Sequence, residues 1–277
     1  MNVSLPAGLL PRMVPAERRG RAIVIVLAGI TLALSLGLPA GTEPADALGW
    51  RAAFAALALP AVLLVVWIRR RVPGFPGEAR DERVPLPRVA ALPGIGTVLS
   101  VTLTRLVGHQ VMYPYVAPFS EHTGFGRTGP VLLVFGAATV VGIWLTGLLI
   151  DRCPRRTLLG ALALLASAML ALGRYAGHGA ALLVSVALWG AAFGGTPTLI
   201  QTALVDSSGP ANADVAASLQ TTVYNAGIAA GSLIGGLILA GPGADALPWT
   251  TFLLVTLTLT IVAAGRRHAF PRGAARS

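Results

Sequence analysis

Three polar side chains lie four residues apart inside one otherwise apolar stretch. Arg105, His109 and Tyr113 fall within residues 93–119, and a spacing of four places them on one face of a helix. If that stretch crosses a membrane, a charged arginine there costs about 2.5–3.5 kcal/mol, so it must face a bundle interior or a wet cavity. A cation, an imidazole that can carry a proton and a hydroxyl suit an anionic or hydrogen-bonding substrate. The alternative is a structural polar contact with neighbouring helices.

Two later apolar stretches carry further candidates for the same cavity. Gln201 shares a helical face with two threonines just after Pro197, and Tyr224 and Asn225 lie near the start of the following stretch. These side chains are equally suited to interhelical hydrogen bonds, which are worth about 0.6 kcal/mol each in membrane proteins. Both interpretations stay open at this point.

The sequence contains no set of residues typical of an enzyme. It has no Ser/His/Asp set with matching spacing, no His/Cys cluster for a metal and no phosphate-binding loop. The prediction is therefore of a protein that is not an enzyme and has no metal site and no cofactor. No Asp or Glu lies deep in any apolar stretch.

The composition indicates that lipid is the solvent for much of this chain. Of its 277 residues 55% are hydrophobic and 12% charged, with a mean hydropathy of +0.73, whereas soluble domains carry about 25% charge. The net charge of +10 would favour nucleic-acid binding in a soluble protein. Here the arginines lie in short clusters between apolar stretches, which argues against nucleic acid as a partner and for a lipid bilayer.

Eight stretches are long and apolar enough to cross a bilayer as helices, which takes about 20 residues each. The predicted spans are 22–41, 50–68, 93–119, 129–150, 157–175, 180–205, 215–240 and 249–265. Their unbroken hydrophobicity favours helices over the alternating strands of a barrel. The predicted fold class is therefore an all-α polytopic membrane protein with eight transmembrane helices.

The arginines predict how the chain is divided and oriented. Residues 69–92 are rich in arginine and proline and form a predicted linker between residues 1–68 and 93–266, with a tail at 267–277. Alternating the connections places seventeen arginines on one side and three on the other, with Arg105 inside a span. This bias predicts that both termini are cytoplasmic, in a plasma (inner) membrane.

The shortest connection joins the fourth and fifth predicted spans. It follows Gly147 and contains Asp151, Arg152, Arg155 and Arg156. Two spans joined by so short a turn must form an antiparallel pair. The Asp151 carboxylate is able to pair with an arginine or with the start of the following helix.

Several motifs in order resemble the major facilitator superfamily, in particular its twelve-helix drug:proton antiporter branch with arabinose-efflux and chloramphenicol-efflux relatives. The residues that carry the resemblance are 15–22, Gly37-Leu-Pro39-Ala-Gly41, 49–54, 113–119, the 147–156 turn, and Asn225 with Gly227, Gly231, Gly235 and Gly236. The turn departs from the family pattern at Pro154, where the family has glycine.

The resemblance implies a partial major facilitator fold that lacks the first four helices of the family. It implies roles for Gly37, Pro39 and Gly41 as an antiporter motif and for the 147–156 turn as a cytoplasmic latch. Packing by small residues is the alternative for the first set, and topology alone for the second. The glycine stripe Gly227, Gly231 and Gly235 is predicted to serve helix packing.

The implied function is proton-coupled efflux of a small drug-like or sugar-like molecule by alternating access. The alternative is a truncated, transport-incompetent fragment, or a membrane-embedded interaction partner. In that case a helix from another chain would replace the missing spans.

Overall fold

The computed structural model describes residues 49–71, 84–266 and 269–270. The chain divides into two units at residues 83 and 84, and each is described by itself. Within the described residues every regular element is a helix, in agreement with the predicted all-α fold. The first predicted span, 22–41, lies outside the described residues.

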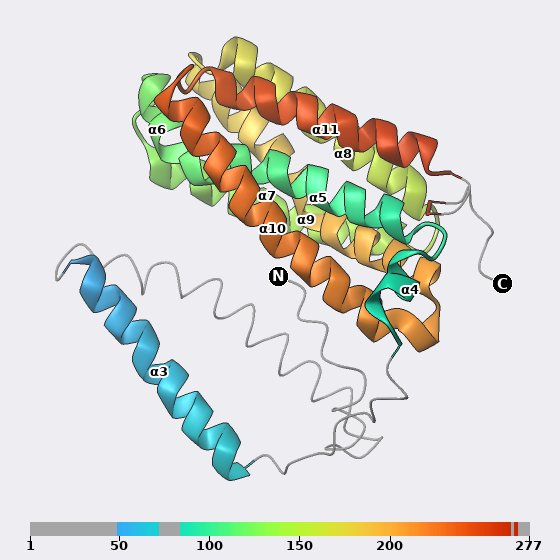
Figure 1. Ribbon diagram of the computed structural model, residues 1–277. Coiled ribbons are helices and arrows are strands. Elements are labelled where there is room, and N and C mark those ends of the chain that lie inside the picture. The colour runs from blue at the N-terminus through green and yellow to red at the C-terminus, as the bar shows by residue number, and fades with distance from the viewer. Residues whose placement is uncertain (1–48, 72–83, 267–268, 271–277) are drawn as a thin grey trace. The chain divides into compact units, whose positions relative to one another are not determined.

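The larger unit is a bundle of long helices (Figure 1). Its elements are α4 (Leu86–Ala90), α5 (Ile95–Met112), η2 (Tyr113–Tyr115), α6 (Val116–His122), α7 (Thr128–Leu149), α8 (Pro154–Tyr175), α9 (Gly179–Ser208), η3 (Pro210–Asn212), α10 (Ala213–Ala240) and α11 (Ala246–Ala264). Short helix α4 falls inside the stretch predicted as linker and contacts α10.

Five helices in the described part of the chain are long and apolar enough to cross a membrane, namely α7, α8, α9, α10 and α11. They coincide with the last five predicted spans to within a few residues. The chain is therefore a multi-pass membrane protein. Helix α8 begins three residues earlier than predicted because Pro154 occupies its first position, where the missing N–H of proline costs nothing.

The predicted span 93–119 is broken into three pieces. Helix α5 ends at Met112, a 3₁₀ turn covers Tyr113–Tyr115, and α6 resumes at Val116. Pro114 lies inside the 3₁₀ turn, and its ring and absent N–H prevent a regular α-helix from continuing. The break places Tyr113 directly after the last turn of α5.

Glycines bring two helix pairs into close backbone contact. A Cβ at Gly142 of α7 would overlap the Ala191 backbone of α9, and one at Gly195 of α9 would overlap the Thr146 side chain of α7. On the other side of the bundle, a Cβ at Gly231 of α10 would lie 2.7 Å from the Val107 carbonyl oxygen of α5.

Gly227 and Gly235 also face α5 at short range. The stripe of Gly227, Gly231 and Gly235 therefore packs α10 on α5, as predicted.

Hydrogen bonds between helices add to this packing. The Thr251 hydroxyl of α11 donates to the Gly108 carbonyl of α5 at 3.0 Å, and Thr258 donates to Thr104 at 2.9 Å. The Tyr115 hydroxyl donates to the Ser232 carbonyl of α10 at 2.5 Å. Together with the glycine contacts, these bonds fix α5 between α10 and α11.

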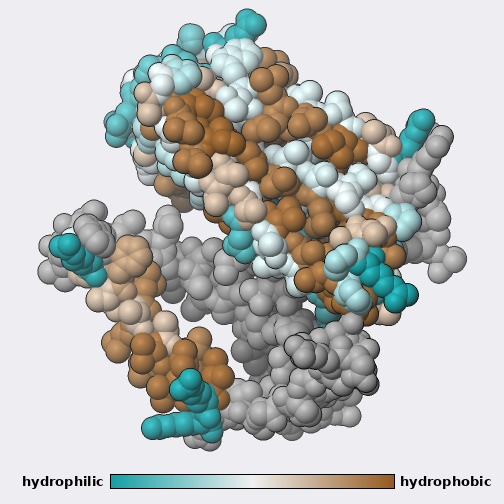
Figure 2. Space-filling view, viewed as in Figure 1, coloured by the Kyte–Doolittle hydropathy of each residue, from teal (hydrophilic) through white to brown (hydrophobic). Residues whose placement is uncertain are grey.

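The surface of the bundle carries many large apolar side chains, visible as brown patches in Figure 2. On α7 they include Leu133, Val140, Ile143, Trp144 and Leu148, each more than half exposed. Exposed apolar side chains are expected where lipid replaces water around a helix.

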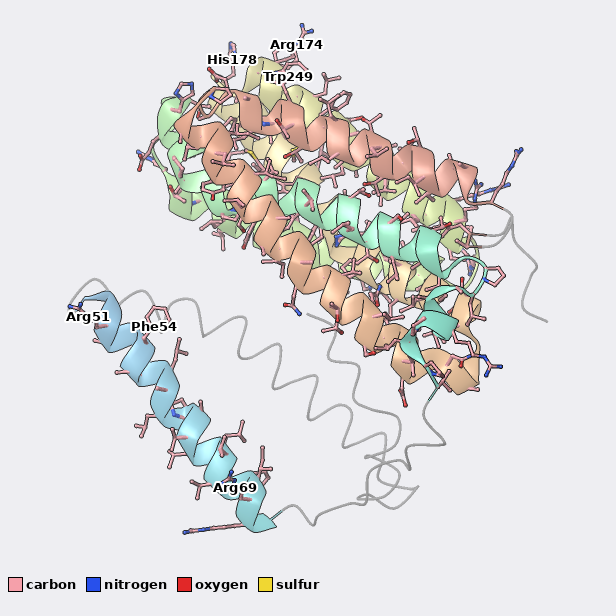
Figure 3. All side chains as sticks on the ribbon, viewed as in Figure 1. Arg51, Phe54, Arg69, Arg174, His178 and Trp249 are labelled. Carbon is pink, nitrogen blue, oxygen red and sulfur yellow. The ribbon has the colours of Figure 1, made fainter. Side chains whose placement is uncertain are left out.

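The smaller unit contributes one described helix, α3 (Trp50–Arg71), which corresponds to the predicted span 50–68. Its middle is apolar, and the labelled side chains Arg51 and Arg69 lie near its opposite ends (Figure 3). This distribution fits a helix whose apolar centre lies in a bilayer with charges near both surfaces.

Candidate functional site

Helix α5 carries the two most polar side chains of the bundle interior. Arg105 is 2% exposed and His109 5% exposed, one helical turn apart on the same face. Tyr113, half-buried in η2, completes the predicted stripe, and its ring stacks on His109 with centroids 4.8 Å apart. The structure thus brings together Arg105, His109 and Tyr113 as the spacing predicted.

Three aromatic residues from α7 and α9 surround this stripe. The rings of Phe193 and His109 stack with centroids 3.8 Å apart, and Trp189 meets His109 edge-on at 5.6 Å. Phe135 of α7 lies 4.9 Å from Trp189. We call Arg105, His109, Tyr113, Phe135, Trp189 and Phe193 the aromatic cluster.

Sequence reasoning missed the three aromatic members of α7 and α9. A phenylalanine or tryptophan in an apolar span is typical of ordinary core packing, so its type alone gives no functional signal. Only the fold shows that these rings enclose the polar stripe of α5.

The guanidinium of Arg105 has an unusual environment. Its Cζ lies 4.6 Å from the centre of the Phe193 ring, a cation–π contact. The Nη1 and Nη2 atoms of Arg105 are buried and have no hydrogen-bond partner among the described residues, and the same holds for His109 Nδ1 and Trp189 Nε1. Tyr224 of α10, another predicted cavity residue, is half-buried.

The other two predicted cavity residues, Gln201 and Asn225, have more ordinary surroundings. Gln201 on α9 is half-buried. Asn225 is exposed, and its amide donates to the Thr221 carbonyl of its own helix at 2.9 Å. Gln220 of α10, by contrast, donates to Thr102 of α5 at 3.4 Å. This is an interhelical hydrogen bond, the alternative to a cavity role for polar side chains of these helices.

The turn between α7 and α8 is tight and charged. The backbone N–H groups of Arg152 and Cys153 both donate to the Leu149 carbonyl, at 3.1 and 3.0 Å. Asp151 is exposed, and no ion pair involves it among the described residues. Gly147 lies in the last turn of α7, with open space where a Cβ would stand.

The arginines of this turn differ in their contacts. Arg152 and Arg156 are exposed, whereas Arg155 is half-buried and its Nη2 donates to the Ala263 carbonyl at 3.0 Å. Ala263 lies in the last turn of α11, whose carbonyls have no partner within the helix. Arg155 therefore links the start of α8 to the end of α11.

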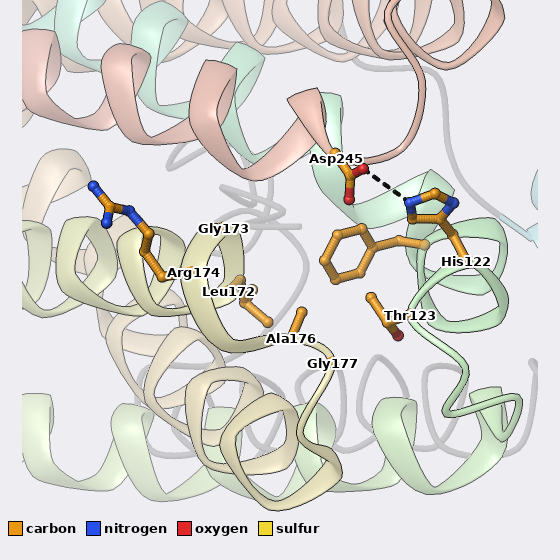
Figure 4. A pocket seen from close by; sticks show the side chains of 9 residues that line it. His122, Thr123, Leu172, Gly173, Arg174, Ala176, Gly177 and Asp245 are labelled. Carbon is orange, nitrogen blue, oxygen red and sulfur yellow. Dashed lines mark ion pairs between the residues drawn. The ribbon is translucent and has the colours of Figure 1, made fainter.

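A cavity of about 300 Å³ lies at the opposite end of the bundle (Figure 4). Its lining residues are Phe119, His122, Thr123, Leu172, Gly173, Arg174, Ala176, Gly177 and Asp245. Two of them form an ion pair, in which His122 Nε2 and Asp245 Oδ2 lie 3.0 Å apart. Arg174 contacts the Trp249 ring from 5.5 Å, and both lie at this end in Figure 3. The pattern of the sequence did not predict this cavity.

The three residues predicted as an antiporter motif, Gly37, Pro39 and Gly41, lie outside the described residues. Within the described ranges, no three His, Cys, Asp or Glu side chains lie together in a way that could hold a metal ion.

Comparison with known proteins gives consistent matches. The model of the family described as Major Facilitator Superfamily matches residues 1–231 and 98–272. A probable sugar efflux transporter from Mannheimia succiniciproducens is 30% identical over 85% of this chain and 60% of its own length. The purine ribonucleoside efflux pump NepI from Escherichia coli (strain K12) is 28% identical over 93% of this chain and 66% of its own.

A solved structure, the crystal structure of an auto-inhibited POT family peptide transporter, matches with a TM-score of 0.58. The two sequences are 16% identical, and the match covers 66% of this chain and 39% of the peptide transporter. At this identity the likeness concerns the fold alone. The chain spans about 60–66% of the length of the two curated relatives. These matches are to transporters, in agreement with the prediction that the chain is not an enzyme.

Proposed function

Since this chain belongs to the major facilitator superfamily, we propose that it serves the export of a small molecule across a membrane by alternating access, coupled to protons. The observation that carries this proposal is the aromatic cluster, where a charged arginine is held inside an apolar bundle. An arginine there is costly and is typical of a substrate or ion pathway. The efflux function of both curated relatives supports the outward direction.

The proposed substrate pathway passes the cluster. Arg105, His109 and Tyr113 line it from α5 and η2, and Tyr224 of α10 is proposed to line it as well. Gln201 and Asn225 belong to the proposal as residues that line the pathway when the helices move. His109 is the proposed proton carrier, because it is the imidazole of the aromatic cluster and lies one helical turn from Arg105.

The turn after α7 is the proposed latch. Gly147, Asp151, Arg152, Arg155 and Arg156 form it, and the contact of Arg155 with α11 supports a role in holding one conformation. Gly37, Pro39 and Gly41 are proposed, from sequence resemblance alone, as an antiporter motif of the drug:proton branch.

The arginine distribution supports a plasma (inner) membrane location with cytoplasmic termini. The substrate is proposed to be drug-like or sugar-like.

The test is an accumulation assay in cells that lack the protein. Expression of this chain should lower the accumulation of a transported sugar, purine ribonucleoside or drug, and dissipating the proton gradient should abolish the effect. The variant Arg105→Ala should lose export. Arg152→Ala, at an exposed position of the turn, should fold as well as the unmodified chain, so that a change of export in this variant is assigned to the latch. Unchanged accumulation with well-expressed chain would favour the alternative, a transport-incompetent fragment or an interaction partner that packs with another membrane helix.

A further inference from the structure

We propose that the substrate of the aromatic cluster is an organic anion with a flat ring, whose two acceptor oxygens are held by Arg105. This inference rests on the proposed transport function and adds the chemical class of the substrate. A carboxylate and a phosphate offer the same acceptor chemistry to a guanidinium, and the experiment below distinguishes them.

The buried positive charge of Arg105 favours a negatively charged ligand. Arg105 is the one charged side chain buried in the described bundle, at 2% exposure. Five carboxylates occur among the described residues, and all are exposed, namely Glu121, Asp151, Asp206, Asp214 and Asp245. Since arginine stays protonated in proteins, a buried guanidinium that has no carboxylate partner among the described residues favours a ligand that brings the negative charge.

The two Nη atoms of Arg105 are available to bind a ligand. Phe193 lies against the guanidinium at 4.6 Å, while both Nη atoms lack a hydrogen-bond partner among the described residues. An aromatic ring covers the flat face of a guanidinium and leaves the N–H groups in its plane available. Two N–H groups in one plane match the two oxygens of a carboxylate, or two of a phosphate, in a bidentate pair.

The cluster holds a further buried donor. Trp189 Nε1, which is only a donor, is buried without a partner in the described part of the chain. His109 stacks on Phe193 and lies edge-on to Trp189. The described residues offer these donors no buried carboxylate, so the site favours a ligand rich in acceptors.

The aromatic side chains of the cluster indicate the shape of the rest of the ligand. Phe135, Tyr113, Trp189 and Phe193 give the cluster aromatic walls. Aromatic side chains favour another flat ring in stacked or edge-on contact. The acceptor group of the ligand is therefore expected to be attached to a ring rather than to a flexible chain.

The experiment uses the full chain purified in detergent and three probes of one shape. Benzoate and phenyl phosphate carry the anion on a ring, and benzamide is the neutral counterpart of benzoate. We expect an anion to raise the unfolding temperature in a saturable manner and benzamide to have no effect. Stabilisation by benzoate alone identifies a carboxylate substrate, and stabilisation by phenyl phosphate alone identifies a phosphate.

Variants then assign the effect to Arg105. Arg105→Lys keeps the charge but loses the fork of donors, so the affinity for the anion should fall about tenfold, as expected for one lost charge-assisted hydrogen bond. Arg105→Gln should abolish the preference for the anion over benzamide. Arg127→Gln removes the same charge from an exposed position outside the cluster and the turn after α7 and should bind the anion as the unmodified chain does.

Three results would overturn the proposal: equal stabilisation by benzamide and benzoate, no stabilisation by either anion, or an unchanged preference in Arg105→Lys and Arg105→Gln. The comparison among probes on the unmodified chain does not depend on whether a variant folds. Export of a neutral sugar, measured separately with the same chain in proteoliposomes, tests the proposed function itself. Sugar export without anion preference would overturn the substrate class alone, and anion binding without export of any probe would overturn the transport function.

Discussion

Replacing Gly142 by alanine should separate α7 from α9. The added Cβ would stand 2.7 Å from the Ala191 carbonyl carbon and 2.9 Å from its Cα, and closer still to the carbonyl oxygen. All three atoms belong to the backbone, so no side chain can rotate away and the helices themselves must move. Overpacking of this kind costs about 1–3 kcal/mol.

Gly136→Ala is the matched control in the same helix. Gly136 is exposed, with nothing within 4 Å of the position of its Cβ, so alanine there should be neutral or stabilise the helix by up to about 1 kcal/mol. The free energies of unfolding of the two variants should therefore differ by about 1–4 kcal/mol.

Unfolding of the purified chain in mixed micelles, titrated with SDS and followed by circular dichroism, measures this difference. Equal stability of the two variants would refute the close contact of α7 and α9.

Three further substitutions test single contacts by the same unfolding measurement. Arg155→Gln should cost about 1 kcal/mol through its lost hydrogen bond to the end of α11, whereas exposed Arg152→Gln should change stability little; equal effects would contradict the α8–α11 link. Thr251→Val keeps the volume of a fully buried side chain and loses its hydrogen bond to α5, so it should cost about 0.6 kcal/mol; an unchanged stability would mean that the bond contributes nothing. Tyr115→Phe should cost about 1 kcal/mol because it removes the hydroxyl that donates to a carbonyl of α10, and a stabilised variant would argue against that bond.

The sequence predicted the helices well because apolar stretches in a membrane protein report directly on the length and number of spans. The five apolar helices agree with predicted spans, and the glycine stripe of α10 lies at the helix contact as expected. The break at Tyr113–Tyr115 was not predicted. The hydropathy gives no sign of the break, because the stretch stays apolar through it. Pro114, by contrast, indicated it.

The site was predicted only in part. The spacing of Arg105, His109 and Tyr113 gave one face of a helix, and the stacking of His109 on Tyr113 agrees with it. What the spacing cannot give is the partner helix. Phe193 and Trp189 come about eighty residues later in the chain, and only the packing of α9 against α5 brings them to the stripe.

The polarity of α5 has a consequence for how the protein is made. Helix α5 is not among the helices apolar enough to cross a membrane by length and composition, and an isolated arginine in such a segment opposes insertion by the translocon. The helices that pack around it, α9, α10 and α11, are synthesised later. We therefore expect α5 to remain beside the insertion machinery until α11 has emerged, so nascent chains that end before residue 246 should leave α5 open to proteases.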